Sequence, residues 1–239
     1  MLLASPGPTV IAAAVILLAA LATGVGAPVV LRRLPEPVPP PDADARVQQE
    51  YAAKPGYRSL ARPRFIGCCV AMSALAMIIC TTARPPADWA CWLVFGTVGV
   101  LLAAIDAATS WLPSRLIYPG WLAMALATVV TVALTDRPRI DLFITIVGGA
   151  VLAGLGYLLL WLVTAGRSVA FGDVRLMPLV GAVAGTMGWP GLYWSVLLGS
   201  VIGAVIGIGR LIARRRGPFP YAPALVAGPY ATALLTALF

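Results

Sequence analysis

The chain consists of long apolar stretches separated by short polar segments. The uncharged apolar stretches cover residues 9–31, 65–83, 89–105, 116–135, 142–166, 176–209 and 217–239. Most of them have the length of about 20 residues that a helix needs to cross a bilayer. The stretch 176–209 is too long for one crossing, and its Gly188-Trp189-Pro190-Gly191 segment is typical of a turn. The pattern therefore predicts about eight spans.

The composition supports a membrane location for these stretches. Hydrophobic residues make up 60% of the 239 residues and charged residues only 11%, whereas a soluble domain has about 45–50% and about 25%. A bilayer forces backbone polar groups to pair within helices or a closed barrel, and the unbroken apolar runs exclude a barrel, whose strands alternate. We therefore expect an all-α, polytopic transmembrane helix bundle.

The basic residues predict the orientation of this bundle. Lysine and arginine are scattered between the apolar stretches with no patch interleaved with aromatics, so the net charge of +8 indicates a lipid bilayer rather than a nucleic acid as partner. Fourteen of the 17 basic residues lie in segments 32–64, 106–115, 167–175 and 210–216. By the positive-inside rule these segments are cytoplasmic, and the N-terminus is outside.

Three regions follow from this topology. Residues 1–31 are expected to be a first transmembrane anchor rather than a cleaved signal, because no basic residue precedes the apolar run and Arg32 and Arg33 follow it. Residues 32–64 form a cytoplasmic loop whose PEPVPPPDADA segment is proline-rich, and we expect it to be partly disordered. Residues 65–239 form the membrane-embedded helix bundle.

The residue inventory excludes several kinds of site. The chain has no histidine, and its four cysteines, at positions 68, 69, 80 and 91, form no CxxC pair. A histidine-based triad and a zinc ribbon are therefore absent, and we expect neither a metal nor a cofactor. The cysteines are interpreted as small apolar helix residues, with a disulfide between Cys80 and Cys91 left open.

Glycines recur at four-residue spacing in the last third of the chain. They are Gly181, Gly185, Gly199, Gly203 and Gly207. Small residues at this spacing let helix backbones approach closely. We expect tight helix packing there and assign no chemistry to these residues.

Two of the nine acidic residues, Asp106 and Asp173, stand at the ends of apolar stretches. Two complete spans separate them, so both carboxylates are expected at the same membrane face, the cytoplasmic one. An ionisable residue at such a place is costly and is by default a functional-site hypothesis. An aspartate at a helix start can also be a plain N-cap, and one at a membrane boundary can simply be solvated.

A pair of carboxylates supports general acid–base catalysis with water as the nucleophile, which needs no metal, histidine or nucleophilic serine. Held close, the two groups cannot both ionise easily, so one keeps its proton while the other activates water. Gly172 lacks a Cβ and would let backbone or substrate approach, and Arg115 and Arg175 could orient a helix end or contact the substrate. Three other aspartates, Asp88, Asp136 and Asp141, are expected at the outer face and to tolerate alanine.

At these residues the chain resembles the type IV prepilin leader peptidases, membrane aspartic proteases of the GxGD class. The family's first motif, ID-x-x-x-x-x-LPD, is similar to IDAATSWLPSRL here, and GxGDxKL is similar to AFGDVRL. The segment RRRGPFPYAPALVAG resembles the family's PFGP-type segment before its last helix. The resemblance covers roughly residues 65 to 239 and implies Asp106 and Asp173 as the catalytic pair, with Pro113, Arg115, Gly172 and Arg175 supporting the motifs.

The chain departs from the family pattern at several positions. Ala170 replaces the first motif glycine, Arg175 replaces the lysine, and Ser114 replaces the aspartate after Leu-Pro. Many members also carry a cytoplasmic domain with a four-cysteine zinc motif and N-methylate the pilin, whereas loop 32–64 has no cysteine. The resemblance therefore implies a short form for which we do not assign methylation.

The resemblance implies a function and leaves two alternatives. The expected function is cleavage of prepilins or pseudopilins after the glycine that ends their basic leader, at the cytoplasmic face of the inner (plasma) membrane. A proton-coupled carrier would place its titrating groups near the midplane and often shows internal repeats, and no repeat is visible here. A non-catalytic scaffold of a pilus or secretion system is the other alternative. The identity of the pilin and the oligomeric state are not specified by these patterns.

Overall fold

Helices make up the ordered architecture of the chain. The structure is a computed structural model that describes residues 7–39, 41, 44–214 and 219–238. Within these residues the elements, in chain order, are α1 (Pro8–Arg33), α2 (Ala45–Ala53), η1 (Tyr57–Leu60), α3 (Pro63–Ala83), η2 (Pro86–Asp88), α4 (Trp89–Val94), η3 (Phe95–Gly99), α5 (Val100–Thr109), α6 (Ser114–Leu134), α7 (Arg139–Val163), α8 (Phe171–Gly185), α9 (Gly188–Ile212) and α10 (Ala222–Leu238).

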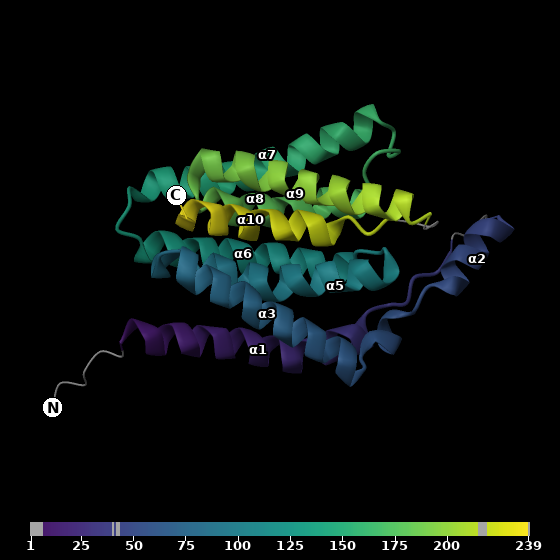
Figure 1. Cartoon of the computed structure of the whole chain (residues 1–239), viewed down its shortest axis with the longest axis horizontal. Coiled ribbons are helices and arrows are strands. Elements are labelled where there is room, and N and C mark those ends of the chain that lie inside the picture. Colours follow the sequence, from purple (N-terminus) through teal and green to yellow (C-terminus); the bar gives the residue numbers. More distant parts are fainter. Residues whose placement is uncertain (1–6, 40, 42–43, 215–218, 239) are drawn as a thin grey trace.

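The long helices lie roughly parallel and form one bundle (Figure 1). Helix α2 extends beyond one end of the bundle, and we call that end the α2 end. The connections from α5 to α6 and from α7 to α8, the end of α9 and the start of α10 all lie at the α2 end, so the bundle brings segments that are distant in sequence to one place.

The all-α polytopic prediction is confirmed. In the part of the chain that the structure describes, six helical segments are long and apolar enough to cross a membrane: Thr9–Arg33, Pro63–Ala83, Pro86–Thr109, Ser114–Leu134, Arg139–Val163 and Gly188–Ile212. Helices α8 and α10 have only 15 and 17 residues. Each of the eight predicted spans contains a helix, and the chain is a multi-pass membrane protein. The number of crossings and the outside N-terminus stay predictions.

Two helix boundaries differ from the expected ones. The chain turns at Thr186 and Met187, and the predicted turn residues, beginning with Gly188, form the first turn of α9 instead. A proline is accepted there because the first helical N–H groups have no intrahelical partner. The third apolar stretch also continues as helix to Thr109, so Asp106 lies within the helix rather than after it.

The glycine spacing predicts helix packing correctly at four of five positions. A Cβ on Gly181 would lie 2.1 Å from the carbonyl oxygen of Gly149, and one on Gly185 would lie 2.2 Å from that of Thr145, so α8 packs backbone to backbone on α7. On α9, a Cβ on Gly199 would lie 3.2 Å from the carbonyl oxygen of Ala224 of α10, and one on Gly203 would meet the ring of Tyr221. The prediction is wrong for Gly207, where nothing lies within 4 Å.

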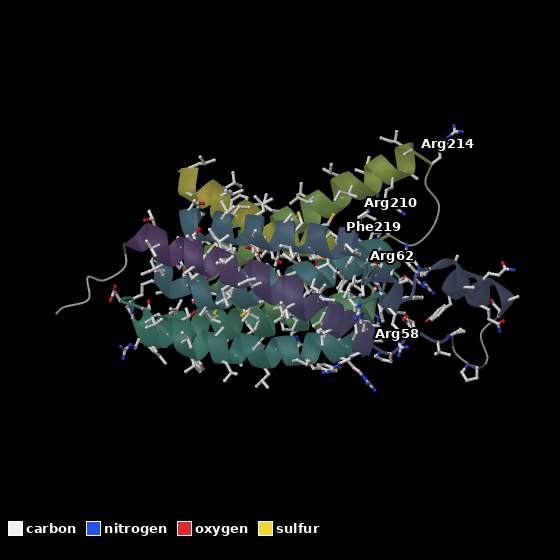
Figure 2. The ribbon with its side chains drawn as sticks, turned by 90° about the horizontal axis from the view of Figure 1, so that it is seen from below. Arg58, Arg62, Arg210, Arg214 and Phe219 are labelled. Carbon is white, nitrogen blue, oxygen red and sulfur yellow. The ribbon has the colours of Figure 1, made fainter. Side chains whose placement is uncertain are left out.

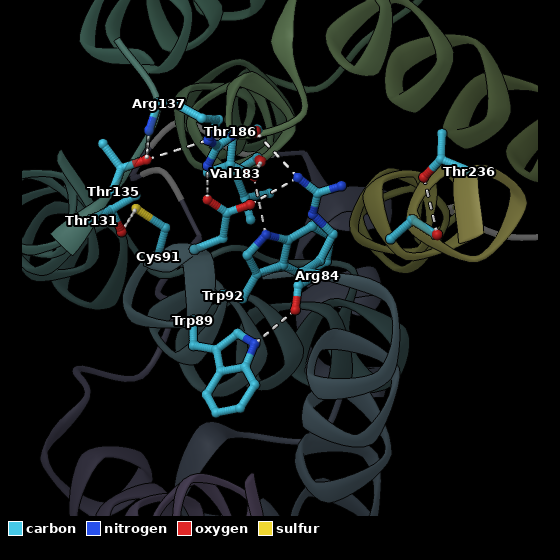
Figure 3. A network of polar contacts seen from close by, with 12 residues as sticks. Arg84, Trp89, Cys91, Trp92, Thr131, Thr135, Arg137, Val183, Thr186 and Thr236 are labelled. Carbon is cyan, nitrogen blue, oxygen red and sulfur yellow. Dashed lines mark hydrogen bonds and ion pairs between the residues drawn. The ribbon is translucent and has the colours of Figure 1, made fainter. Parts of the chain in front are cut away.

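An ionic network around a buried carboxylate (Figure 3) lies between the ends of α3 and α8, at the end of the bundle opposite the α2 end (Figure 1). Asp88 is fully buried and pairs with Arg84 at 2.8 Å and with Arg137. Both arginines also donate to the carbonyl oxygen of Thr186, whose hydroxyl accepts from the Trp92 indole at 3.1 Å. The network joins α3, α4, α8 and the loop before α7, so Asp88 is a structural residue.

From the sequence alone the three outer aspartates look alike, but the structure shows that they are not equivalent. Asp136 and Asp141 are exposed, as expected for residues that tolerate alanine. Replacement of Asp88 by alanine would leave Arg84 and Arg137 without the carboxylate with which they pair. The expectation that Asp88 tolerates alanine is corrected by this burial and pairing.

All four cysteines are free, so the open possibility of a Cys80–Cys91 disulfide is not realised. Cys69, Cys80 and Cys91 are buried, and the Cys91 sulfur lies 3.3 Å from the Thr131 hydroxyl. Cys68 is exposed on α3. Three of the four thus pack as small apolar side chains, in agreement with the interpretation from the sequence.

Candidate active site

Asp106 lies in the last turn of α5, at the α2 end. Its side chain is only 5% exposed, so it is not a solvated boundary residue. The helix ends three residues later, because Ser110 adopts a left-handed conformation (φ 56°) and donates its N–H to the Asp106 carbonyl at 2.7 Å. The carboxylate itself accepts a hydrogen bond from the backbone N–H of Ala222, with Oδ2 at 3.0 Å from the nitrogen.

Asp173 lies in the first turn of α8 and precedes the apolar run that starts at Leu176. The N-cap of this helix is Ala170, so the alternative reading of Asp173 as a plain N-cap does not hold. Asp173 is also 5% exposed. Burial, and second the negative charge of Asp106, raise the pKa of Asp173 to about 7, while the backbone of Ala170 opposes this. The two carboxylates therefore lie within electrostatic reach of each other.

The two motif segments contact each other directly. A Cβ on Gly172 would lie 3.0 Å from the Cβ of Leu112, so α8 approaches the loop after α5 closely here, and a side chain at position 172 would require Leu112 to shift. Arg175 donates a hydrogen bond to the Ser114 hydroxyl, which joins two of the positions where the chain departs from the family motif. Leu112 is thus the neighbour that makes the close approach predicted for Gly172.

Further contacts hold Arg175 in place. Its guanidinium lies 4.5 Å from the centre of the Phe171 ring. Its carbonyl oxygen accepts a hydrogen bond from the Trp121 indole at 3.0 Å, which ties α8 to α6. Arg175 therefore links α8 to α6 and does not pair with either carboxylate of the candidate site among the interactions of the described residues.

Pro113 and Arg115 flank Ser114 at the start of α6. Pro113 is buried and is the N-cap of α6. Arg115 is exposed and lines a pocket of about 250 Å³ together with Glu36 and Tyr57. The structure thus directs Arg115 toward the loop after α1, and its expected contact with a substrate stays a prediction.

The loop between α1 and α3 contributes residues that the sequence did not indicate. Tyr57 is buried, and burial, then the charge of Glu36, raises its pKa to about 12, with Asp106 also within reach. The charge of Lys54 acts on Asp106, and its ammonium lies 4.6 Å from the centre of the Trp111 ring. No motif spacing marks these residues, because they reach the site only through the folding of the loop.

The loop is fixed by one carboxylate. Glu36 accepts hydrogen bonds from the backbone N–H groups of Tyr57 at 2.7 Å and Arg58 at 2.9 Å. Gly56 makes room for it, since a Cβ there would lie 2.6 Å from Oε2 of Glu36. Residues 35–39 of the proline-rich segment form neither helix nor strand. The expectation of partial disorder in loop 32–64 stays a prediction.

Arginines surround the α2 end on its outside (Figure 2). Arg58, Arg62 and Arg214 are exposed there, and Arg210 lies 5.8 Å from the Phe219 ring. The pair of carboxylates thus lies at the end of the bundle that gathers basic residues, as the positive-inside count predicts for one face of the membrane.

The arrangement is suited to general acid–base chemistry. Two buried carboxyl groups close enough to influence each other favour a state with one proton between them. Such a pair can activate a water and protonate a carbonyl oxygen at the same time. Among the residues that the structure describes, no group of three His, Cys, Asp or Glu side chains could hold a metal ion.

Comparison with known proteins gives one family. Residues 93–208 match the model of the type IV leader peptidase family, and this range includes both Asp106 and Asp173. The chain is 31% identical over 159 residues to a prepilin leader peptidase/N-methyltransferase of Aeromonas salmonicida, which covers 52% of this chain and 54% of that protein.

Two further relatives carry the same name. One from Aeromonas hydrophila is 33% identical over 141 residues, covering 45% of this chain and 48% of its own length, and one from Pseudomonas putida is 34% identical over 138 residues, covering 54% and 42%. The chain spans about half the length of the curated relatives it matches. No solved structure matches significantly.

Proposed function

Because residues 93–208 match the model of the type IV leader peptidase family, we propose that the chain is a membrane aspartic endopeptidase of that family. Its substrates are type IV prepilins or pseudopilins, and it cleaves them after the glycine that ends the basic leader. The proposal is carried by one observation: Asp106 and Asp173, from two motifs 67 positions apart in the sequence, are buried at the same end of the bundle within electrostatic reach.

The proposed location follows from the distribution of charge. The α2 end carries Arg58, Arg62 and Arg214 on its exterior, which favours a cytoplasmic position for it by the positive-inside rule. We place the protein in the inner (plasma) membrane with its active site at the cytoplasmic face. The scissile bond of a prepilin lies at that depth, where its leader meets its apolar helix, and water is available there.

An apolar groove offers a place for the substrate's helix. It has a volume of about 390 Å³ and lies between α3, α5 and α10. Its floor includes Ala103, Ala104 and Ala107, which flank Asp106 on α5, and Pro223, which follows the residue that donates to Asp106. We propose that the apolar helix of the substrate lies along this groove, so that the peptide bond before the helix reaches the carboxylates.

The alternative functions have less support. A carrier would need titrating groups near the midplane, whereas both carboxylates lie at one end of the bundle. A non-catalytic scaffold would not need two buried aspartates, whose desolvation is costly. N-methylation, which the names of the relatives include, is not part of the proposal, because loop 32–64 lacks the four-cysteine motif.

Co-expression with a prepilin tests the proposal. The chain and a prepilin from the same genome are produced together in a host that lacks its own leader peptidase. Wild type is expected to shorten the prepilin, with the new N-terminus directly after the leader glycine, as determined by mass spectrometry. A chelator should leave the activity unchanged. Failure of the folded, membrane-inserted wild type on every prepilin of that genome would contradict the proposed function.

A further inference from the structure

The two carboxyl groups of the site are equally buried but have different surroundings. Each is 5% exposed. Asp106 accepts a hydrogen bond from the N–H of Ala222 at 3.0 Å and lies within reach of the positive charge of Lys54. Asp173 has the negative charge of Asp106 as its strongest electrostatic neighbour, with a smaller favourable influence from the Ala170 backbone. The surroundings therefore favour charge on Asp106 over charge on Asp173.

The donor to Asp106 stands at a helix N-terminus. Ala222 is the first residue of α10, which has 17 residues. The N–H groups of a first helical turn have no partner within the helix, and the helix dipole favours negative charge beside them. A carboxylate that accepts such an N–H is stabilised in its ionised form. The contact is buried, so water does not compete with it.

We propose that Asp106 is the ionised general base of the pair and Asp173 the protonated general acid, and that the N–H of Ala222 sets this assignment. The inference rests on the proposed peptidase function and deepens it. Ala222 is a positioning residue, because it acts through Asp106 and has no contact with the reacting atoms. The N-terminus of α10 thereby becomes part of the active site.

The assignment gives each proton a defined path. Asp106 takes a proton from water while the water oxygen forms a bond to the scissile carbonyl carbon, and Asp173 gives its proton to the carbonyl oxygen. In the collapse of this gem-diol the C–N bond breaks, Asp106 gives its proton to the leaving nitrogen, and Asp173 recovers a proton from a hydroxyl. The products are a carboxylic acid and an amine, and the enzyme returns to its starting state.

Removal of one hydrogen atom tests the assignment. Ala222→Pro deletes the N–H, and proline is well accepted at the first position of a helix. We expect kcat to fall about tenfold or more, as for a lost hydrogen bond to a charged group, with KM changed less than about twofold. The acid limb of the kcat–pH profile should move up by about one pH unit, while the alkaline limb stays in place.

Ala222→Gly is the matched control. It keeps the N–H and adds no atoms at a fully buried position, so the acid limb should stay where wild type has it. An unshifted acid limb in folded Ala222→Pro, or a shift of the alkaline limb instead, would overturn the inference. The groups that also act on the pair are Lys54, Tyr57 and Tyr157, and neither variant alters them.

A spectroscopic measurement does not depend on the folding of the proline variant. Infrared difference spectra of reconstituted protein with carboxyl-¹³C aspartate, recorded from about pH 5 to pH 9, detect a protonated carboxyl group. The band should persist to a higher pH in Asp106→Asn than in Asp173→Asn. The reverse pattern would exchange the roles and overturn the inference, even if wild type cleaves prepilin. Absence of cleavage by wild type would instead contradict the proposed function itself.

Discussion

At the scale of single residues, the site depends on two side chains whose burial gives them their chemistry. Asp106 and Asp173 lie in helices that the sequence marks as apolar, and each is 5% exposed. Their spacing in the sequence predicted a shared face, and the structure brings them within electrostatic reach. The Ala222 N–H that contacts Asp106 was not predictable, because every residue except proline carries a backbone donor and no side-chain pattern marks which one is used.

The pH dependence of cleavage follows from Asp173. Its pKa is raised to about 7 by burial and by the charge of Asp106, and the acid must be protonated to act. Cleavage should therefore fall about tenfold per pH unit above about pH 7. Since the folded pKa exceeds the unfolded one, the stability contribution of this group is full at low pH and is lost as pH rises toward 7. An initial-rate profile that stays flat from about pH 6 to pH 9 would contradict this role for Asp173.

Asp88 is predicted to be a stability residue. Asp88→Ala leaves Arg84, whose side chain is 13% exposed, without its carboxylate. We expect a loss of about 3 kcal/mol, the lower end for a broken buried pair, because Arg137 keeps 40% of its side chain exposed. Thermal unfolding in detergent measures the loss. The exposed Asp141 provides the control, since Asp141→Ala should unfold like wild type, and equal stability of the two variants would contradict the network's role.

At the scale of helices, the sequence predicted which segments are helical and where helices pack closely better than it predicted the residues at which each helix begins and ends. All seven apolar stretches contain helices because their composition leaves no other way to satisfy the backbone in a bilayer. The turn before α9 was misplaced by two residues, since a proline near a helix start and a proline in a turn look alike in sequence. Close packing was wrongly predicted for Gly207. The spacing of glycines shows which helix face carries small residues, but it does not show whether another helix packs against that face.

The packing of α8 on α7 is predicted to be intolerant of any side chain. Gly181→Ala would place a Cβ 2.1 Å from a backbone oxygen of α7, and overpacking of this kind costs about 1–3 kcal/mol. Gly207→Ala has open space and should be neutral or slightly stabilising, because alanine is the better helix former by about 0.5–1 kcal/mol. Unfolding of both variants in the same detergent measures the difference. Similar values for the two would show that the backbone contact has no energetic role.

The groove between α3, α5 and α10 gives a prediction about substrate binding. Ala104→Trp would fill part of its volume of about 390 Å³ without altering either carboxylate. We expect KM for a full-length prepilin to rise about tenfold or more, while a short peptide without the apolar helix is unaffected. Leu126→Trp, on an exposed part of α6, is the control. An unchanged KM in Ala104→Trp would exclude this groove as the place of the substrate's helix.

At the scale of the whole molecule, the two ends of the bundle have different roles. The end with Asp88 is closed by buried ion pairs that join four segments. The α2 end holds the carboxylate pair, the loop with Lys54 and Tyr57, and the exterior arginines. This polarity fits a protein that acts at one membrane face. The count of basic residues predicted that they gather at one end of the bundle. The approach of loop 32–64 to Asp106 depends on the hydrogen bonds of Glu36 and could not be predicted from the sequence.

The most direct test of the central claim is cleavage of a prepilin in membranes by wild type, Asp106→Asn and Asp173→Asn, with Asp141→Asn as the control. Wild type and Asp141→Asn should yield the mature N-terminus. Each of the other two variants should lose at least about 10²–10⁴-fold in rate, the contribution typical of general acid–base groups, while inserting and unfolding like wild type. Cleavage at a normal rate by folded Asp106→Asn or Asp173→Asn would contradict the claim that these two carboxyl groups are the catalytic pair.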